Sequence, residues 1–245
     1  MRALTAVDLV DLWEQGWESG FAGRAILLLS RTHPEISHEK LEAMSLGVRD
    51  DLLLQLRAQL FGSRLESVVS CPKCGDSLEI SVDARDLRAE GEASEPPATE
   101  WTAGDLWVRF RVPTSGDLHD LEAYRDPQDV RRQLLERCVI EAQRSSQRIE
   151  PSQLTPLETS ALGERMAHAD PQGELTLSAD CPTCGHRWES LLDIASFLWR
   201  ELDIHVRRLL AEVHTLASAY AWSERDILEM SARRRQIYLD ELLAR

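Results

Sequence analysis

Basic charge is scarce in this chain of 245 residues. Its 28 Lys and Arg are outnumbered by 42 Asp and Glu, which gives a net charge of −14 at pH 7, and lysine stands only at Lys40 and Lys73. Free-standing nucleic-acid binders neutralise phosphates with a basic face, and anionic membranes attract basic segments. We therefore expect neither nucleic acid nor a membrane surface as a partner.

Long hydrophobic runs are also missing. The longest uninterrupted apolar run spans residues 25–29, whereas a membrane-spanning helix needs about 20 apolar residues. Near the N-terminus, Asp8, Asp11 and Glu14 interrupt the apolar stretch that a signal peptide requires. These absences predict a cytoplasmic protein, in which the cysteines serve as thiols or metal ligands rather than as disulfides.

Motifs for catalysis are absent as well. The sequence has no phosphate-cradling glycine-rich loop, no Gly-x-Ser-x-Gly elbow and no His-Glu-x-x-His. Cys138 lies among apolar residues in a helical pattern, which predicts a buried free thiol. The arginine run at 233–235 is typical of a solvated helix face, with a phosphate site as the alternative. We therefore predict a protein without enzymatic activity.

What is present is the composition of a globular protein, with 43% apolar and 29% charged residues. Helical periodicity dominates and period-two alternation marks short strands, so the predicted fold class is α+β and mostly helical. We expect six segments: an N-terminal helical region over 1–62, a first hairpin over 63–88, a linker over 89–100, a strand with helices over 101–170, a second hairpin over 171–193, and a C-terminal helical region over 194–245.

Capping residues predict where many helices begin, because a Ser or Thr side chain can accept a hydrogen bond from the first helical turn. The expected N-caps are Thr5, Ser37, Ser45, Ser223 and Ser231. In the middle of the chain we expect a strand over 106–112 and helices over 115–124, 127–141 and 156–167.

A long helix is predicted over residues 194–220, because apolar residues recur there at alternating steps of three and four. These residues are Trp199, Leu202, Val206, Leu209, Val213, Leu216 and Tyr220. Such a stripe packs lengthwise against another helix. It favours a seam inside the protein's own core, and a docking face for a partner helix is the alternative.

The most informative feature is a repeat within the chain. Residues 71–75 are Cys-Pro-Lys-Cys-Gly, and residues 181–185 are Cys-Pro-Thr-Cys-Gly. Strand-like alternation around each copy predicts a hairpin whose turn, or knuckle, carries two thiols. Two intervening residues let both sulfurs face one ion, while the glycine permits a positive φ and exposes amide hydrogens towards the thiolates.

One knuckle supplies two ligands, whereas structural zinc takes four in a tetrahedron. The two knuckles together predict a closed four-cysteine site of Cys71, Cys74, Cys181 and Cys184 with a structural Zn²⁺, in a zinc ribbon-like arrangement of the two hairpins. A redox pair is expected at a helix start and without a second copy. An iron–sulfur cluster remains compatible with the ligand type. His186 could replace a cysteine, although we expect it to be solvated.

Three further stretches carry a resemblance to a known family. Residues 46–54 are Leu-Gly-Val-Arg-Asp-Asp-Leu-Leu-Leu and lead to Leu-Phe-Gly at 60–62; residues 108–118 form a strand that leads into a helix; and residues 214–239 contain Trp-Ser-Glu-Arg-Asp-Ile-Leu. Over about residues 5–243 this set resembles the baseplate proteins of phage-tail-like contractile injection systems, which are related to the T-even phage hub assembly chaperones.

The resemblance implies a non-enzymatic role in building the baseplate or its hub, either within the particle or as an assembly chaperone. Hub, spike or wedge subunits are the implied partners, and we expect them to contact the N-terminal helices and the helical region over 202–239. The alternatives are a zinc-ribbon regulatory or nucleic-acid accessory protein, and a redox enzyme that uses one Cys-x-x-Cys pair.

Overall fold

The computed structural model describes residues 1–88 and 94–244. The helices are α1 (Ala6–Gln15), α2 (Phe21–Thr32), α3 (His38–Ala43), α4 (Leu46–Phe61), α5 (Ser115–Leu121), α6 (Pro127–Cys138), α7 (Pro156–Ala169), α8 (Ile194–Tyr220), α9 (Glu224–Leu228) and α10 (Ala232–Leu243), with short 3₁₀ turns at η1 (Pro151–Gln153) and η2 (Pro171–Gly173). The strands are β1 (Arg64–Ser70), β2 (Ser77–Asp83), β3 (Thr99–Ala103), β4 (Leu106–Phe110), β5 (Val139–Arg144), β6 (Gln147–Arg148), β7 (Thr176–Asp180) and β8 (Arg187–Leu191). The predicted class, α+β and mostly helical, is confirmed.

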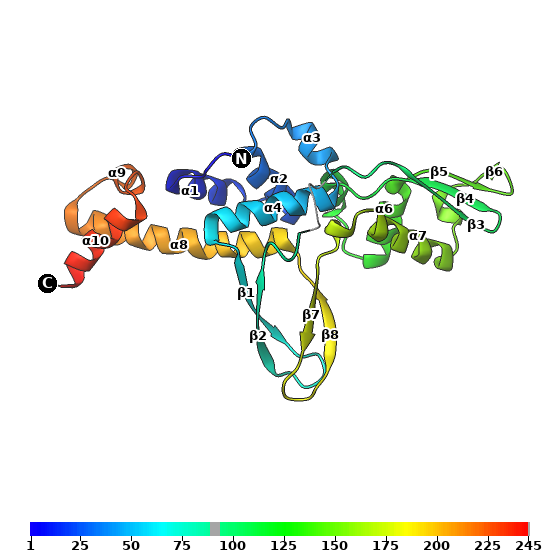
Figure 1. Cartoon of the computed structure of the whole chain (residues 1–245). Helices are drawn as coiled ribbons and strands as arrows, with labels where there is room; N and C mark the ends of the chain where they lie inside the picture. Colours follow the sequence, from blue (N-terminus) through cyan, green and yellow to red (C-terminus); the bar gives the residue numbers. More distant parts are fainter. Residues whose placement is uncertain (89–93, 245) are drawn as a thin grey trace.

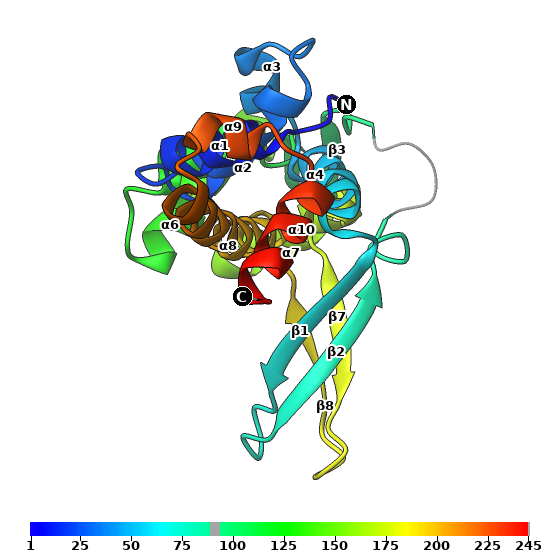
Figure 2. The ribbon, with the colours of Figure 1, turned by 90° about the vertical axis from the view of Figure 1, so that its left-hand side faces the viewer.

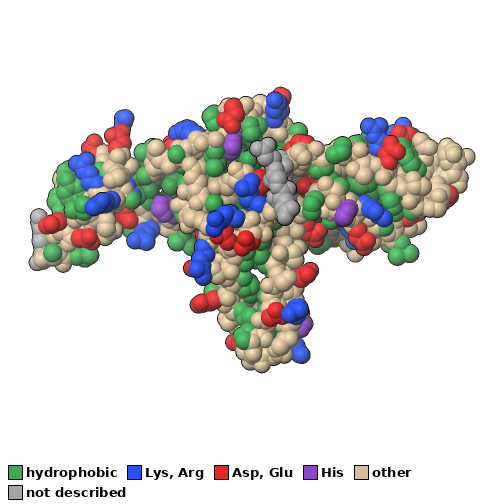
Figure 3. All heavy atoms as spheres, in the orientation of Figure 1, with side chains coloured by type: hydrophobic (Ala, Val, Ile, Leu, Met, Phe, Trp, Pro, Cys, Tyr) green, Lys and Arg blue, Asp and Glu red, His purple; other side chains and the backbone are tan. Residues whose placement is uncertain are grey.

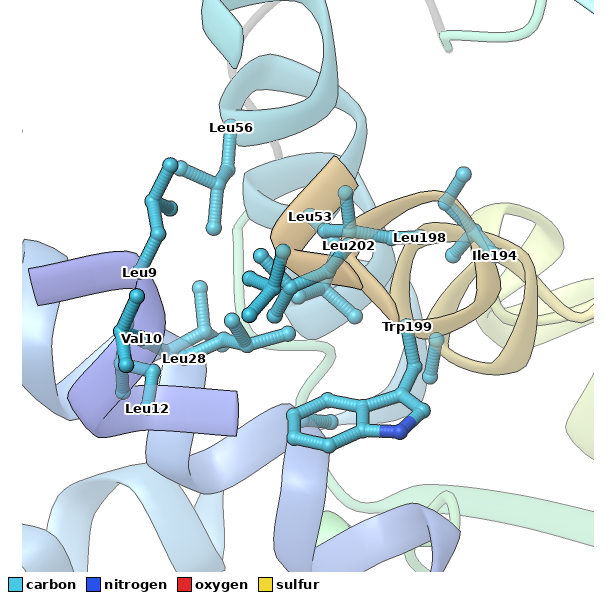
Figure 4. Packing of buried hydrophobic residues seen from close by; sticks show 14 of the residues in the cluster. Leu9, Val10, Leu12, Leu28, Leu53, Leu56, Ile194, Leu198, Trp199 and Leu202 are labelled. Atoms are coloured by element: carbon cyan, nitrogen blue, oxygen red, sulfur yellow. The ribbon is translucent and has the colours of Figure 1, made fainter. Parts of the chain in front are cut away.

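Helices α1 to α4 and α8 to α10 form what we call the helical body, which lies along the horizontal axis of Figure 1. Side chains from α1, α2, α4 and α8 meet in one large hydrophobic cluster (Figure 4). The expected N-caps are confirmed, since each of the five Ser and Thr side chains accepts a hydrogen bond from a backbone amide of its helix. The starts of α1, α3, α4, α9 and α10 are therefore encoded locally, whereas α2 begins after Gly20 without a side-chain cap.

Helix α8 has the predicted bounds, and its apolar stripe is buried in the body. Leu202, Val206 and Leu216 are completely enclosed, and Leu209 and Val213 are nearly so. The stripe is thus an intramolecular seam rather than a face left open for a partner helix. Among the described residues, no helix combines the length and the apolar composition needed to cross a membrane.

Charged residues of α4 are buried along with its leucines. Arg57 is 3% exposed; its Nε and Nη2 donate to the Glu201 carboxylate at 2.9 and 2.7 Å, and its Nη1 donates to the carbonyls of Gly62 and Arg64 at 2.7 and 2.6 Å. One guanidinium therefore connects α4 to α8 and to the start of β1.

A four-stranded antiparallel sheet in the order β3-β4-β5-β6 occupies the far end of the molecule, beside α6 and α7 (Figure 1). The helix expected over 127–141 is wrong beyond Cys138, because α6 ends there and the chain continues as β5. Pairing with β4 buries Val139 and Ala142 against Val108 and Phe110, and this tertiary contact decides the conformation.

Two further expectations are tested in this region. Cys138 is a free thiol with no exposure, and burial raises its pKa to about 12, so the predicted buried thiol is confirmed. The linker expected over 89–100 overlaps strand β3 at Thr99 and Glu100, because those residues pair with β4; its residues 89–93 lie outside the described part of the chain.

Two antiparallel hairpins project from the body and together form what we call the arm, residues 64–83 and 176–191 (Figures 1 and 2). Each hairpin is a separate two-stranded sheet, β1 with β2 and β7 with β8. In the space-filling view the arm stands clear of the rest of the molecule, with acidic and basic side chains along its sides (Figure 3). The two cysteine knuckles lie at its tip.

Candidate metal centre

The two knuckles have the same backbone geometry. In the first, the Cys71 amide donates to the Asp76 carbonyl at 2.8 Å and the Gly75 amide donates to the Cys71 carbonyl at 2.9 Å. In the second, both equivalent bonds, which join Cys181 to His186 and to Gly185, measure 2.9 Å. Gly75 and Gly185 have φ values of 76° and 66°, in the left-handed region that glycine adopts without a steric penalty.

The hairpins bring all four predicted cysteines together. The Sγ atoms of Cys71 and Cys184 lie 3.7 Å apart, and those of Cys74 and Cys181 lie 3.6 Å apart, so each close pair joins the two hairpins. All four Sγ atoms lie within 4.8 Å of one another. The four cysteines could therefore hold one metal ion between segments more than a hundred residues apart.

The two shortest distances between the sulfurs match those around a single tetrahedral ion. With Zn–S bonds of about 2.3 Å, the edges of a regular tetrahedron of sulfurs measure about 3.8 Å, close to the two Sγ–Sγ distances of 3.7 and 3.6 Å. Cys71 and Cys181 are each 2% exposed, whereas Cys184 is half-buried and Cys74 is exposed. The cluster is therefore covered on the side of the hairpin stems and open at the tip of the arm.

The electrostatics of the cluster favour thiolates only in part. Burial raises the pKa of Cys71, but the amides of Cys74 and Lys73 and two neighbouring thiols outweigh it and lower that pKa to about 7. For Cys74, hydrogen bonding to the Asp76 amide lowers the pKa, while burial and the three neighbouring thiols raise it to about 12. Four thiols this close cannot all ionise without a cation to offset their mutual repulsion.

A contact outside the thiols also joins the two knuckles. The Thr183 hydroxyl donates to the Asp76 carboxylate, which links the two turns across 107 residues of sequence. This pair was not predicted from the sequence, where the only signal is a polar residue close to a cysteine in each copy. His186 is half-buried and stacks on Trp188, with ring centroids 6.0 Å apart, and it is not one of the four clustered ligands.

The arginine run at 233–235 differs from its expectation. Arg233 and Arg234 are exposed, but Arg235 is 5% exposed; its Nε donates to Glu212 at 3.0 Å and its Nη1 donates to the Met230 carbonyl at 2.7 Å. The expectation of a solvated face is wrong for Arg235, because this residue fastens α10 to α8. Its charge is therefore used within the fold.

Fold and site together define a class of protein, a helical scaffold with a projecting arm whose two halves meet in a cysteine cluster. The chain belongs to the family described as T4 bacteriophage base plate protein, because the model of that family matches residues 28–199, more than two thirds of its length. The family identification made from the sequence is confirmed, and it supports a baseplate structural protein. No curated protein and no solved structure matches the chain.

Proposed function

We propose that this chain is a non-enzymatic baseplate protein, or a baseplate and hub assembly chaperone, of a contractile injection system or phage tail. In this proposal it is made in the cytoplasm and binds hub, spike or wedge subunits. Cys71, Cys74, Cys181 and Cys184 hold a structural Zn²⁺. The observation that carries the proposal is the convergence of four Sγ atoms, within 4.8 Å of one another, in a chain of the base plate family.

The proposed ion has a structural role. When bound, Zn²⁺ supplies four thiolate bonds that close the coordination sphere, which leaves no position for a substrate. The hairpin segments over 63–88 and 171–193 then become one unit, held together at the tip of the arm. The tip of the arm gains a fixed shape that a partner subunit can recognise.

Metal analysis of the purified full-length chain tests the site. We expect one zinc per chain and no acid-labile sulfide, and we expect the double variant Cys74→Ser, Cys184→Ser to lose the metal. Cys138→Ala serves as the control, because Cys138 is buried in a different hydrophobic cluster, with Val108 and Phe110, and its replacement should leave the zinc content unchanged. A natively folded chain without metal, or one with iron and sulfide, would contradict the zinc assignment.

Copurification tests the function. The tagged chain is co-expressed with each hub, spike and wedge subunit of the same particle, and we expect at least one of them to copurify. Mass spectrometry of the finished particles then distinguishes the two forms of the proposal, because a baseplate component stays in the particle and a chaperone leaves it. Failure to bind any of these subunits would overturn the proposed function.

A further inference from the structure

Away from the arm, the turn between α1 and α2 lies against the N-terminal half of α8 and forms a shallow hollow of about 320 Å³. Its rim carries Trp17, Phe21 and three arginines, Arg24, Arg200 and Arg207. We call these five residues the aromatic–arginine surface. Trp17 is 57% exposed and Phe21 is 41% exposed, so two large aromatic side chains of the body are open to solvent.

Hydrogen bonds and ring contacts hold one side of this surface in place. Trp13 Nε1 donates to Asp203 Oδ1 at 2.7 Å, and the Trp13 and Trp17 rings meet edge to face with centroids 5.3 Å apart. Arg207 donates to Asp203 at 3.0 Å, and its guanidinium lies 5.7 Å from the Trp13 ring and 5.8 Å from the Trp17 ring. The exposed Trp17 is therefore fixed before any partner arrives.

Close packing fixes the other side. The Arg24 guanidinium lies 4.7 Å from the centre of the Trp199 ring, and its Nε donates to the Gly16 carbonyl at 2.9 Å. Gly16 touches the same ring so closely that a Cβ there would lie 2.1 Å from it. Preformed Trp and Arg side chains are typical of the residues that dominate binding energy at protein interfaces, since little conformational entropy is lost when they bind.

The charge of the surface is opposite to that of the chain. The charged residues that line the hollow are Arg24, Arg200, Arg207 and Asp203, a net charge of about +2 in a chain of net charge −14. Arg200 is exposed and forms no hydrogen bond or ion pair within the described part of the chain. One cation of the hollow therefore has no carboxylate partner among the described residues and is available to a carboxylate of another protein.

We propose that the aromatic–arginine surface docks an acidic segment of a partner baseplate subunit. An apolar side chain of that segment lies between Trp17 and Phe21, and its carboxylates face Arg200 and Arg207. This inference rests on the proposed function and adds the surface and the chemistry of the partner. Trp17, Arg200 and Arg207 lie outside the residues that the family model matches, so the family assignment does not already define this surface.

The test uses the full-length chain and the hub, spike and wedge subunits of the same particle, with binding measured for each pair. The variants are Trp17→Ala and Arg200→Glu. Matched controls are Leu157→Ala, where an 84% exposed leucine of α7 is shortened, and Arg131→Glu, which reverses an exposed arginine of α6. Thermal unfolding of each variant shows whether the body is still folded.

We expect either variant to weaken binding of one subunit by at least about tenfold, the size of effect that marks a strong interface residue, while both controls bind as the unaltered chain does. Higher salt should weaken the same complex, because the contact pairs opposite charges. If a subunit binds and both variants bind it as tightly as the unaltered chain does, the proposed surface is wrong and the proposed function stands. If no subunit binds, the proposed surface and the proposed function are both overturned. Binding of single-stranded DNA or RNA that depends on Trp17 and Arg200 would replace the protein partner with a nucleic acid.

Discussion

The body buries leucines from helices α1 to α4, α8 and α9 in a single cluster, whereas the arm contributes only Leu65 to that cluster. Within the arm's own residues, 64–83 and 176–191, the buried positions are Leu65, Cys71, Ala179 and Cys181. Its other large apolar side chains are only half-buried or lie at the surface, as with Val68 at 66% and Leu191 at 69% exposure. The two regions therefore cannot be stabilised in the same way.

Burial of one leucine side chain is worth about 1.5–3 kcal/mol, and the body contains many of them. A two-stranded hairpin is at best marginally stable in water, because it has too little apolar surface to cover. The arm consists of two such hairpins, and they meet at their tips through the cysteine cluster and the Asp76–Thr183 bond. A bound metal would supply at the tip what the arm lacks in a core.

The strongest test of this comparison is to treat the purified chain with a chelator, which would remove the proposed metal. We expect the amides of β1, β2, β7 and β8 to exchange with solvent far faster, because the two hairpins lose their common anchor. The amides of α4 and α8 should keep their protection, since their core does not involve the arm. Hydrogen exchange followed by mass spectrometry measures both regions in one experiment.

The double variant Cys74→Ser, Cys184→Ser should give the same pattern without a chelator, and Cys138→Ala should not. If the strands of the arm stay protected after the metal is gone, the hairpins are stable by themselves and the contrast with the body is wrong. Loss of protection throughout α4 and α8 would also contradict it, because the cluster would then stabilise the whole chain.

The second test concerns Arg57, where the body connects to the arm. Arg57→Met removes a guanidinium that pairs with Glu201 and satisfies the carbonyls of Gly62 and Arg64. Breaking a buried ion pair from one side leaves uncompensated polar groups, so we expect the free energy of unfolding to fall by about 3 kcal/mol. Urea denaturation followed by circular dichroism measures this change.

Arg64→Met is the matched control, because Arg64 belongs to the same junction but its side chain is 73% exposed. Its ion pair with Glu66 lies at the surface and spans 3.5 Å, a type that contributes little to stability. Equal effects of the two substitutions would show that burial does not decide the strength of this junction.

The sequence predicts the local features of both regions well. The N-caps and the seven-residue repeat of α8 are properties of short windows, and so are the two knuckles, whose duplication predicts from the sequence alone that four cysteines lie together. Strands β3, β5 and β6 were missed. The pairing of β5 is non-local, because Val139 follows a helix directly and becomes a strand residue only through its contact with β4. Strands β3 and β6 then extend this sheet as short hairpins with β4 and β5.

Burial of charge was the other feature that the sequence could not predict. Arg49, Asp50 and Arg57 are buried side chains of α4, and nothing in the sequence of α4 itself reveals that. The raised pKa of Asp50, about 6, comes chiefly from that burial. The aromatic–arginine surface could not be predicted for a similar reason, because it forms only when the fold brings a turn near residue 17 against a helix face near residue 200.

The smallest expected effect separates backbone conformation from packing in the arm. Gly75→Ala and Gly185→Ala place a Cβ at residues with φ of 76° and 66°, where no atom lies within 4 Å of it. Because there is no clash, the cost is purely conformational and amounts to about 1–2 kcal/mol. Zinc affinity, measured by competition with a chromophoric chelator, should fall by roughly tenfold for either variant.

Gly163→Ala should stabilise the protein, in contrast to the two substitutions in the arm. Gly163 lies in α7 with helical backbone, and a Cβ added there would likewise have no atom within 4 Å, so alanine should raise the free energy of unfolding by about 0.4–1 kcal/mol through a less flexible unfolded chain. Zinc affinity should not change, because α7 does not reach the cluster.

Equal losses of zinc affinity in Gly75→Ala and Gly185→Ala would mean that both knuckles hold the proposed ion in the same way. A loss in one variant alone would show that the backbone conformation of the other knuckle does not limit zinc binding.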